Sequence, residues 1–197
     1  HEVKSELGPD RVQNGRFDTD IRNWFGWPGD SLRAMWDEGR LQLRHTGQAP
    51  VIHYDAPVGP IEAGRSYRLW FKANSDQPNR WLRVYLRKWE PDYRSLGEVL
   101  DLPLGGQPEA YEVVFTATQT EPRSLLIFEL PNASQVVWLD DVELIPVEAE
   151  PLHRARWVRV EANPTMEPRE LSLEEDHSDA AGRLYPAGSV ITIEPFR

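Results

Sequence analysis

The chain has 197 residues and a mass of 22.7 kDa, which fits one large domain or one domain with a small appendage. It carries 22 Lys and Arg against 32 Asp and Glu, a formal net charge of −10 that argues against a nucleic-acid binder. There is no cysteine, which excludes disulfides, thiolate metal sites and a cysteine nucleophile. No run of 18 apolar residues occurs, so we predict no membrane-spanning helix and no membrane partner.

Alternation of apolar and polar residues predicts an all-β protein. In the segment 67–73, Tyr67, Leu69 and Phe71 fall on one face of a strand, and Trp70 falls on the other. Similar patterns predict strands at 32–36, 40–45, 51–54, 81–87, 111–117, 124–130 and 136–144. Short strands between Gly- and Pro-rich turns indicate a sandwich or a barrel, and residues 172–181 are interpreted as a turn.

A change of composition divides the chain. The acidic segment 146–151 has proline at both ends and is typical of a connector. We therefore expect a main domain at residues 1–146 and a β extension at residues 147–197, with strands at 157–162, 169–173 and 189–193. An extension this short cannot bury a core of its own, so we expect it to pack on the main domain.

Three motifs in the main domain carry a family resemblance. They are Asn14-Gly-Arg-Phe17 followed by Trp24, then Gly64-Arg-Ser-Tyr67-Arg-Leu-Trp-Phe71, and finally Trp138-Leu-Asp-Asp-Val-Glu-Leu144. In order and spacing they resemble carbohydrate-binding modules of the family 4/9/22 type. The resemblance implies a jelly-roll β-sandwich that binds β-linked polysaccharide without cleaving it. It also implies a secreted module on the same polypeptide as a glycoside hydrolase or a lyase, and we expect it to be monomeric.

A binding face follows from the family topology, which implies that the strands at 40–45, 67–73, 81–87 and 124–130 share one concave sheet. Aromatic rings cover the C–H face of a sugar, while Arg, Gln and Glu pair with its hydroxyls. The outward residues proposed for ligand binding are Gln42, Arg44, Arg68, Trp70, Arg83, Tyr85, Arg87 and Glu129. Trp27, Trp89 and Tyr93 are added because large rings in loops often carry function. Packing roles are predicted for Trp24, Trp36 and Trp157, and for Trp138 on the opposite sheet.

The arginines on this face have two interpretations. They could form an ordinary ion-paired sheet surface, or they could recognise the carboxylates of a polyuronate. We favour a neutral ligand such as β-glucan, xylan or mannan, because Glu129 and Gln42 would gain nothing from an anionic chain. A purely structural sandwich, the third possibility, predicts no exposed row of aromatic rings.

Acidic residues support a metal site and an enzymatic alternative. The resemblance implies a structural calcium held by Asp18 and Asp140 with backbone carbonyls, and Asp20 and Asp141 are alternates. The same acids could simply be solvated. A jelly-roll hydrolase or lyase would need a carboxylate pair such as Glu129 with Glu112 or Glu143. Alternation places Glu129 apart from the other two, which disfavours that pair.

Overall fold

The computed structural model describes residues 1–90, 92–131, 134–150, 163, 165, 167–174, 177–178 and 184–195. The chain divides into two compact units, residues 1–150 and residues 151–197. All regular elements among the described residues are β-strands, which confirms the all-β prediction. Among these residues no helix is long and apolar enough to cross a membrane.

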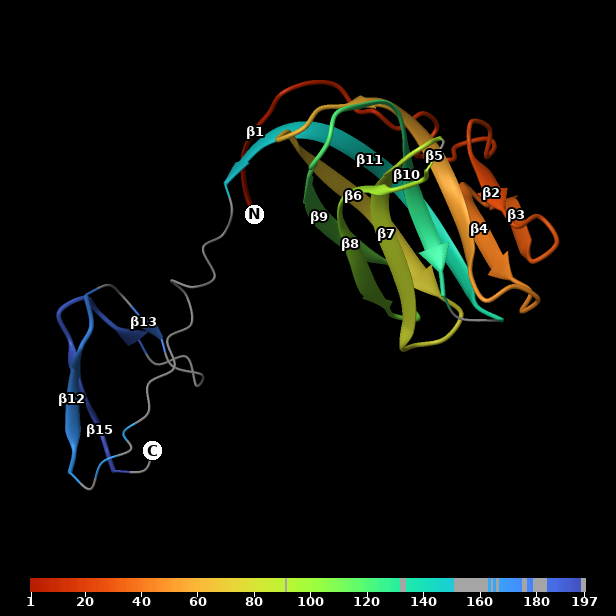
Figure 1. Cartoon of the computed structure of the whole chain (residues 1–197). Coiled ribbons are helices and arrows are strands. Elements are labelled where there is room, and N and C mark those ends of the chain that lie inside the picture. Colours follow the sequence, from red (N-terminus) through yellow and green to blue (C-terminus); the bar gives the residue numbers. More distant parts are fainter. Residues whose placement is uncertain are drawn as a thin grey trace. The chain divides into compact units, whose positions relative to one another are not determined.

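The first unit is a sandwich of two antiparallel sheets (Figure 1). Sheet A has the strand order β3-β4-β11-β6-β9, and β1 pairs with β11. Its strands are β1 (Glu2–Glu6), β3 (Leu32–Asp37), β4 (Arg40–His45), β6 (Ser66–Ser75), β9 (Glu109–Thr116) and β11 (Val136–Glu150). Sheet B has the order β2-β5-β10-β7-β8. Its strands are β2 (Phe25–Trp27), β5 (Ile52–Ile61), β7 (Arg80–Lys88), β8 (Ser95–Leu104) and β10 (Glu121–Leu130).

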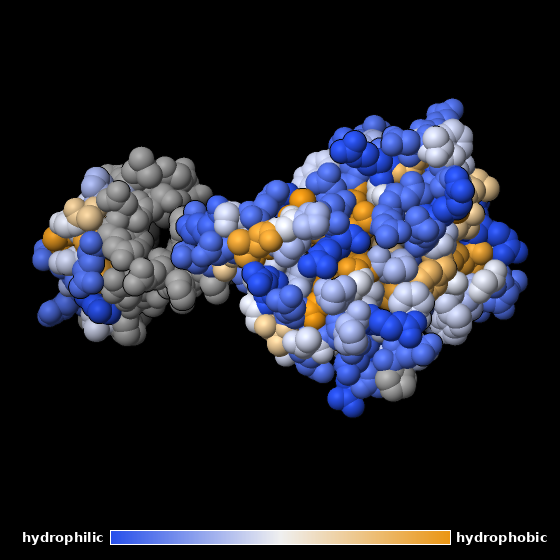
Figure 2. All heavy atoms as spheres, turned by 90° about the horizontal axis from the view of Figure 1, so that it is seen from above, coloured by the Kyte–Doolittle hydropathy of each residue, from blue (hydrophilic) through white to orange (hydrophobic). Residues whose placement is uncertain are grey.

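Aromatic rings fill the centre of the core between the sheets. Trp24 stacks on Tyr54 with ring centroids 6.1 Å apart, and it contacts Phe17 at 5.2 Å. Phe71 of sheet A meets Phe128 of sheet B edge-on at 5.3 Å, which joins the two sheets. Trp24 is only 7% exposed, so its predicted packing role is confirmed. The face of the molecule seen in Figure 2 is mostly hydrophilic, as expected when apolar side chains lie inside.

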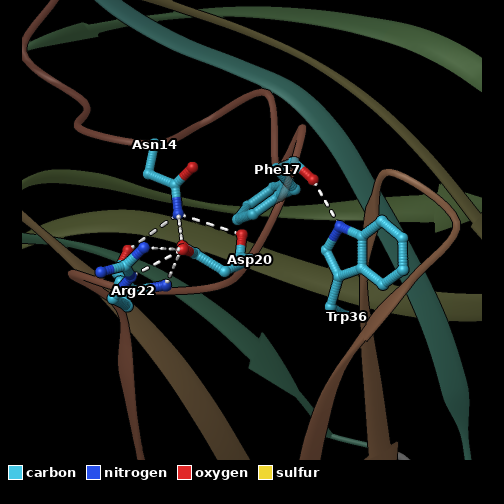
Figure 3. A network of polar contacts seen from close by, with 5 residues as sticks. All are labelled: Asn14, Phe17, Asp20, Arg22 and Trp36. Atoms are coloured by element: carbon cyan, nitrogen blue, oxygen red, sulfur yellow. Dashed lines mark hydrogen bonds and ion pairs between the residues drawn. The ribbon is translucent and has the colours of Figure 1, made fainter.

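The first family motif is a structural loop. Asn14 has a φ of 56°, and its side-chain amide donates to the carbonyl oxygens of Asp20 and Arg22 at 3.0 Å each (Figure 3). The carbonyl oxygen of Gly15 accepts the Val142 amide of β11 at 2.9 Å. Phe17 is fully buried in the core. The motif therefore fixes the chain against sheet A.

Trp36 departs from its predicted packing role. It is 45% exposed, and its indole Nε1 donates to the carbonyl oxygen of Phe17 at 2.7 Å (Figure 3). The side chain therefore anchors the motif loop from outside and does not fill the core. Trp157 lies outside the described residues.

The predicted connector was wrong. Residues 146–150 continue β11, and Val147 to Glu150 pair with β1 near the N-terminus. The carbonyl of Pro146 accepts the Leu7 amide at 2.8 Å. Proline and acidic residues suggested a break, but a distant partner strand supplies the pairing that local composition cannot reveal.

Three strands of the sandwich were not predicted: β1, β2 and β8. All three lie at margins of the sheets, where exposure weakens the alternation of apolar and polar residues. β2 is only three residues long and contains Gly26.

The second unit contains two small antiparallel pairs. β12 (Arg169–Ser172) pairs with β15 (Val190–Ile193), which confirms the predicted strands at 169–173 and 189–193. β13 (His177–Ser178) pairs with β14 (Leu184–Tyr185). The predicted strand at 157–162 lies outside the described residues.

Candidate functional site

The predicted binding residues do not share one sheet. Gln42, Arg44, Arg68 and Trp70 belong to β4 and β6 of sheet A. The second group, Arg83, Tyr85, Arg87 and Glu129, belongs to β7 and β10 of sheet B. The expectation that the strands at 40–45, 67–73, 81–87 and 124–130 share one concave sheet was therefore wrong. Alternation assigns a residue to a face of its strand, but it does not determine which sheet the strand joins.

On the outer face of sheet A, the two tryptophan rings are already engaged. The Lys72 ammonium lies 5.7 Å from the Trp70 ring centroid and pairs with Asp141 at 2.8 Å. Trp138, expected on the opposite sheet from Trp70, is in the same sheet. The Arg40 guanidinium lies 5.7 Å from the Trp138 ring centroid. Each of these two rings therefore has a cation near one of its faces.

The polar candidates of sheet A are also held within the protein. Arg68 pairs with Glu6 of β1 at 2.7 Å. The Gln42 amide donates to Asp37 at 3.3 Å, and Asp37 also accepts the Trp138 indole N–H at 2.6 Å. Arg44 is exposed at the end of β4. Arg68 and Gln42 of sheet A are thus already paired with side chains of the protein itself.

On sheet B the strand register brings the other candidates together. One row across the five strands holds Trp27, His53, Glu129, Arg83 and Asp101. The next row holds Phe25, Asp55, Ile127, Tyr85 and Val99. These side chains project from the outer face of sheet B, and Arg87 of β7 continues the same phase beside Leu125.

Arg83 is held by two carboxylates. Its Nε donates to Asp101 at 2.7 Å, and its Nη1 donates to Glu129 at 3.0 Å. The hydrogen bonds to Asp101 raise the pKa of Arg83, and they lower the pKa of the Asp101 carboxyl. Both groups therefore stay charged and paired at neutral pH.

Tyr85 donates its hydroxyl proton to Glu129 at 3.0 Å. Burial raises the pKa of Tyr85, and the nearby Glu129 charge raises it further. The phenol therefore stays neutral, with a polar hydroxyl on an otherwise apolar ring.

Beside this row lies a pocket of about 500 Å³, which is within the range of ligand sites. It is lined by Phe25, Gly26, Trp27, His53, Asp55, Arg87, Trp89, Tyr93 and Leu125. Trp27 and Tyr93 are 60% and 52% exposed at the rim, and the Arg87 guanidinium lies 5.2 Å from the Tyr93 ring centroid. Trp27, Trp89 and Tyr93 were predicted from the sequence, and the structure places all three at this pocket.

The pocket floor is an ion cluster. Asp55 is 1% exposed, and its carboxylate lies 2.6 Å from His53 Nδ1 and 3.0 Å from Arg87 Nη2. The Trp27 ring stacks on His53 with centroids 5.7 Å apart. A buried carboxylate needs such partners, because an unpaired charge is very costly in the interior.

Four residues of this pocket were not predicted from the sequence: Phe25, His53, Asp55 and Leu125. The predicted strand stopped at residue 54, although the alternation continues past it. Buried Tyr54 and Ala56 fall between the outward positions 53, 55 and 57. Extending the strand by that alternation would have found Asp55, whereas His53 already lay in the predicted strand, which was not assigned to the binding sheet.

The implied calcium site is only partly supplied by side chains. Asp18 is exposed, whereas Asp140 is half-buried, and burial raises the pKa of the Asp140 carboxyl. The alternates are occupied, because Asp20 pairs with Arg22 and Asp141 pairs with Lys72. Within the described ranges no three His, Asp or Glu side chains gather as a metal site would require. Calcium at Asp18 and Asp140 would depend on backbone carbonyls and stays a prediction of the resemblance.

The carboxylate pairs of the enzymatic alternative are not formed. Glu129 lies on the outer face of sheet B, whereas Glu112 belongs to β9 and Glu143 to β11, both in sheet A. Glu129 therefore cannot act on one glycosidic bond together with Glu112 or Glu143. In sheet A the register places Glu112 and Glu143 on either side of Trp70.

Comparisons with known proteins show the fold. No family model and no curated protein matches the sequence. A solved structure described as "CBM4 structure and function" has 21% identity and a TM-score of 0.58, covering 68% of this chain and 99% of that chain. The N-terminal cellulose-binding domain of Cellulomonas fimi β-1,4-glucanase C has 21% identity and a TM-score of 0.55, covering 73% and 99%.

Two further structures extend the comparison. The CBM22-1 xylan-binding domain of Paenibacillus barcinonensis Xyn10C has 10% identity and a TM-score of 0.53, covering 75% of this chain and 100% of that chain. The enzymatically active domain of tailspike protein 4 from bacteriophage CBA120 has 15% identity and a TM-score of 0.54, but the match covers only 21% of that chain. The β-sandwich of this chain thus has the jelly-roll fold of carbohydrate-binding modules of the CBM4 and CBM22 type.

Proposed function

We propose that this chain is a non-catalytic carbohydrate-binding module and that it binds a neutral β-linked polysaccharide on the outer face of sheet B. The observation that carries the proposal is the pocket with aromatic walls and a polar floor described above. The fold supports it, since solved structures with this fold include a cellulose-binding domain and a xylan-binding domain.

The chemistry of the pocket suits a pyranose ring. Such a ring has an apolar C–H face, which Trp27 or Tyr93 can cover, and a rim of hydroxyls, which His53 and Arg87 can meet. Covering roughly 100 Å² of apolar area at about 25 cal/mol per Å² contributes on the order of 2.5 kcal/mol per ring. Two such contacts give roughly micromolar to millimolar affinity once ordering costs are subtracted.

The charges of this face favour a neutral ligand. Arg83 is paired with Asp101 and Glu129, and Arg87 is paired with Asp55. These two guanidinium groups therefore face three carboxylates. A polyuronate would have to compete with those carboxylates for each arginine and would be repelled by them. Hydroxyls can add hydrogen bonds without breaking the pairs.

The biological setting is part of the proposal. We infer a secreted, monomeric module within a larger polypeptide, where it holds an attached glycoside hydrolase or lyase close to its polysaccharide. β-Glucan, xylan and mannan are the glycans to test first. Calcium at Asp18 and Asp140 would serve the fold and not the binding face.

The test compares one tryptophan on each sheet. Trp27→Ala should weaken binding to insoluble cellulose, xylan or mannan by about tenfold or more, because a ring contact on the order of 2.5 kcal/mol is lost. Trp70→Ala, on the outer face of sheet A, is the matched control and should bind as the wild type does. Calorimetric titration measures the affinity, and a thermal melt checks the fold of each variant.

Two results would contradict the proposal. If Trp70→Ala abolishes binding while Trp27→Ala does not, the ligand lies on sheet A. If the wild-type chain releases reducing sugar from the glycan it binds, the chain is an enzyme.

A further inference from the structure

The pocket on sheet B is a corner closed on two sides. One wall is β2, the edge strand of the sheet, with Phe25 and Trp27. The other wall is the segment after β7, with Trp89 and Tyr93. The walls meet where the Phe25 and Trp89 rings contact each other, with centroids 5.3 Å apart. The Arg123 guanidinium lies 4.8 Å from the Trp89 ring centroid, which braces that ring from the side of β10.

Away from the corner the face continues across the sheet. From the pocket, the rows defined by the strand register lead over β10 and β7 to β8, past Glu129, Tyr85 and Arg83. A glycan chain that lies across the strands can therefore leave the pocket toward β8. In the opposite direction it meets the side chains of β2, the last strand of the sheet.

We propose that the corner receives the terminal pyranose of a neutral glycan chain and not an internal unit. This inference rests on the proposed function. An internal unit carries a further sugar at both ends, and the one directed at β2 would collide with Phe25. A terminal unit carries a free hydroxyl at that position instead.

The pocket floor suits that extra hydroxyl. His53, Asp55 and Arg87 line the closed end and are joined in one cluster, with distances of 2.6 Å and 3.0 Å to the Asp55 carboxylate. Charged partners make stronger hydrogen bonds than neutral ones, and a hydroxyl can both accept from a guanidinium and donate to an imidazole nitrogen. A glycosidic oxygen at the same place can only accept. The floor therefore favours a chain end over a linkage.

The stoichiometry of binding tests whether the corner receives chain ends. The soluble probes are xylan, mixed-linkage β-glucan and glucomannan, each used intact and after partial hydrolysis to shorter chains at equal mass. We expect the amount of module bound per milligram to rise in proportion to the number of chain ends. We also expect one module per chain on xylo-, cello- and manno-oligosaccharides of every length that binds.

The outcomes separate the two proposals. Binding per milligram that is unchanged by hydrolysis would show internal binding and overturn this inference, while the proposed function would stand. No binding to any of these glycans would overturn the proposed function, and this inference with it.

A variant that removes a ring from the β2 wall provides a second test of the preference for chain ends. Phe25→Ala removes one ring of the corner from an exposed position on a short edge strand, and Met35→Ala removes a similarly exposed side chain from β3 of sheet A. We expect Phe25→Ala to bind internal units, so that the amount bound no longer follows the number of ends. Met35→Ala should keep the dependence on ends. An unchanged end dependence in a folded Phe25→Ala protein would contradict the role of the wall, and Trp89→Ala repeats the test from the other side.

Discussion

Asp55 illustrates how a binding floor can be built from a single buried charge. It lies in the middle of β5, on a face that would ordinarily be solvated, yet it is 1% exposed. Arg87 from β7 and His53 from its own strand provide its polar contacts, and Trp27 covers His53. The aromatic rim therefore shields an ion pair that gives the pocket its polar centre.

We predict that Arg87→Met destabilises the fold by about 3–5 kcal/mol, because it leaves the Asp55 carboxylate buried without its arginine partner. Urea unfolding monitored by tryptophan fluorescence measures the change. The matched control is the double variant Asp55→Asn with Arg87→Met, which removes both charges and should recover most of the loss. Equal stability of Arg87→Met and wild type would mean that solvent reaches Asp55 more freely than its burial indicates.

Among elements, the N-terminal motif loop shows why the family resemblance could predict the fold. Gly15 lies against β11, and a Cβ at this position would collide with the backbone carbonyl oxygen of Val142. Its own carbonyl oxygen accepts the Val142 amide at 2.9 Å. The glycine is therefore required by a close approach of two backbones.

We predict that Gly15→Ala destabilises the protein by about 1–3 kcal/mol, since loop and strand must separate to admit the methyl group. Gly106→Ala is the matched control, because a Cβ there meets nothing within 4 Å and the residue is exposed. Denaturant midpoints of the two variants give the comparison. A Gly15→Ala midpoint equal to that of Gly106→Ala would refute the close packing of this loop on β11.

The fold of the sandwich could be predicted from the sequence more fully than the binding site. The motif residues Phe17, Tyr67, Leu69 and Phe71 are all buried, so the motifs carry the packing of the sandwich and its fold could be predicted from them. The site could be predicted where rings interrupt Gly- and Pro-rich segments, as at Trp27, and where alternation placed a polar residue outward, as at Arg87. Sheet membership depends on pairing between distant strands, and alternation within one strand contains no information about it.

At the scale of the whole molecule, the net charge bears on the choice of ligand. The chain carries a formal charge of −10, and the face seen in Figure 2 is dominated by hydrophilic residues. On the binding face the arginines are matched by carboxylates, so no local cationic field offsets that total. A polyanion would therefore approach against repulsion, whereas a neutral chain would feel none.

We therefore predict that affinity for a neutral β-glucan or xylan barely changes between low and high salt. Contacts between uncharged hydroxyls and already paired side chains neutralise no net charge, so screening has little to act on. Binding of a polyuronate would instead depend on exposed ion pairs, which are screened over a Debye length of about 8–10 Å near physiological ionic strength. Calorimetric titration of both ligands at two salt concentrations makes the comparison.

Asp101→Asn is the informative variant, because it frees one side of Arg83, whose Nε and Nη2 both donate to Asp101. This variant should bind the neutral glycan with nearly unchanged affinity. Its affinity for the polyuronate should rise slightly, and that increase should disappear at high salt. A wild-type preference for the polyuronate that weakens with salt would show that the arginines leave their carboxylates to bind ligand, and it would overturn the neutral assignment.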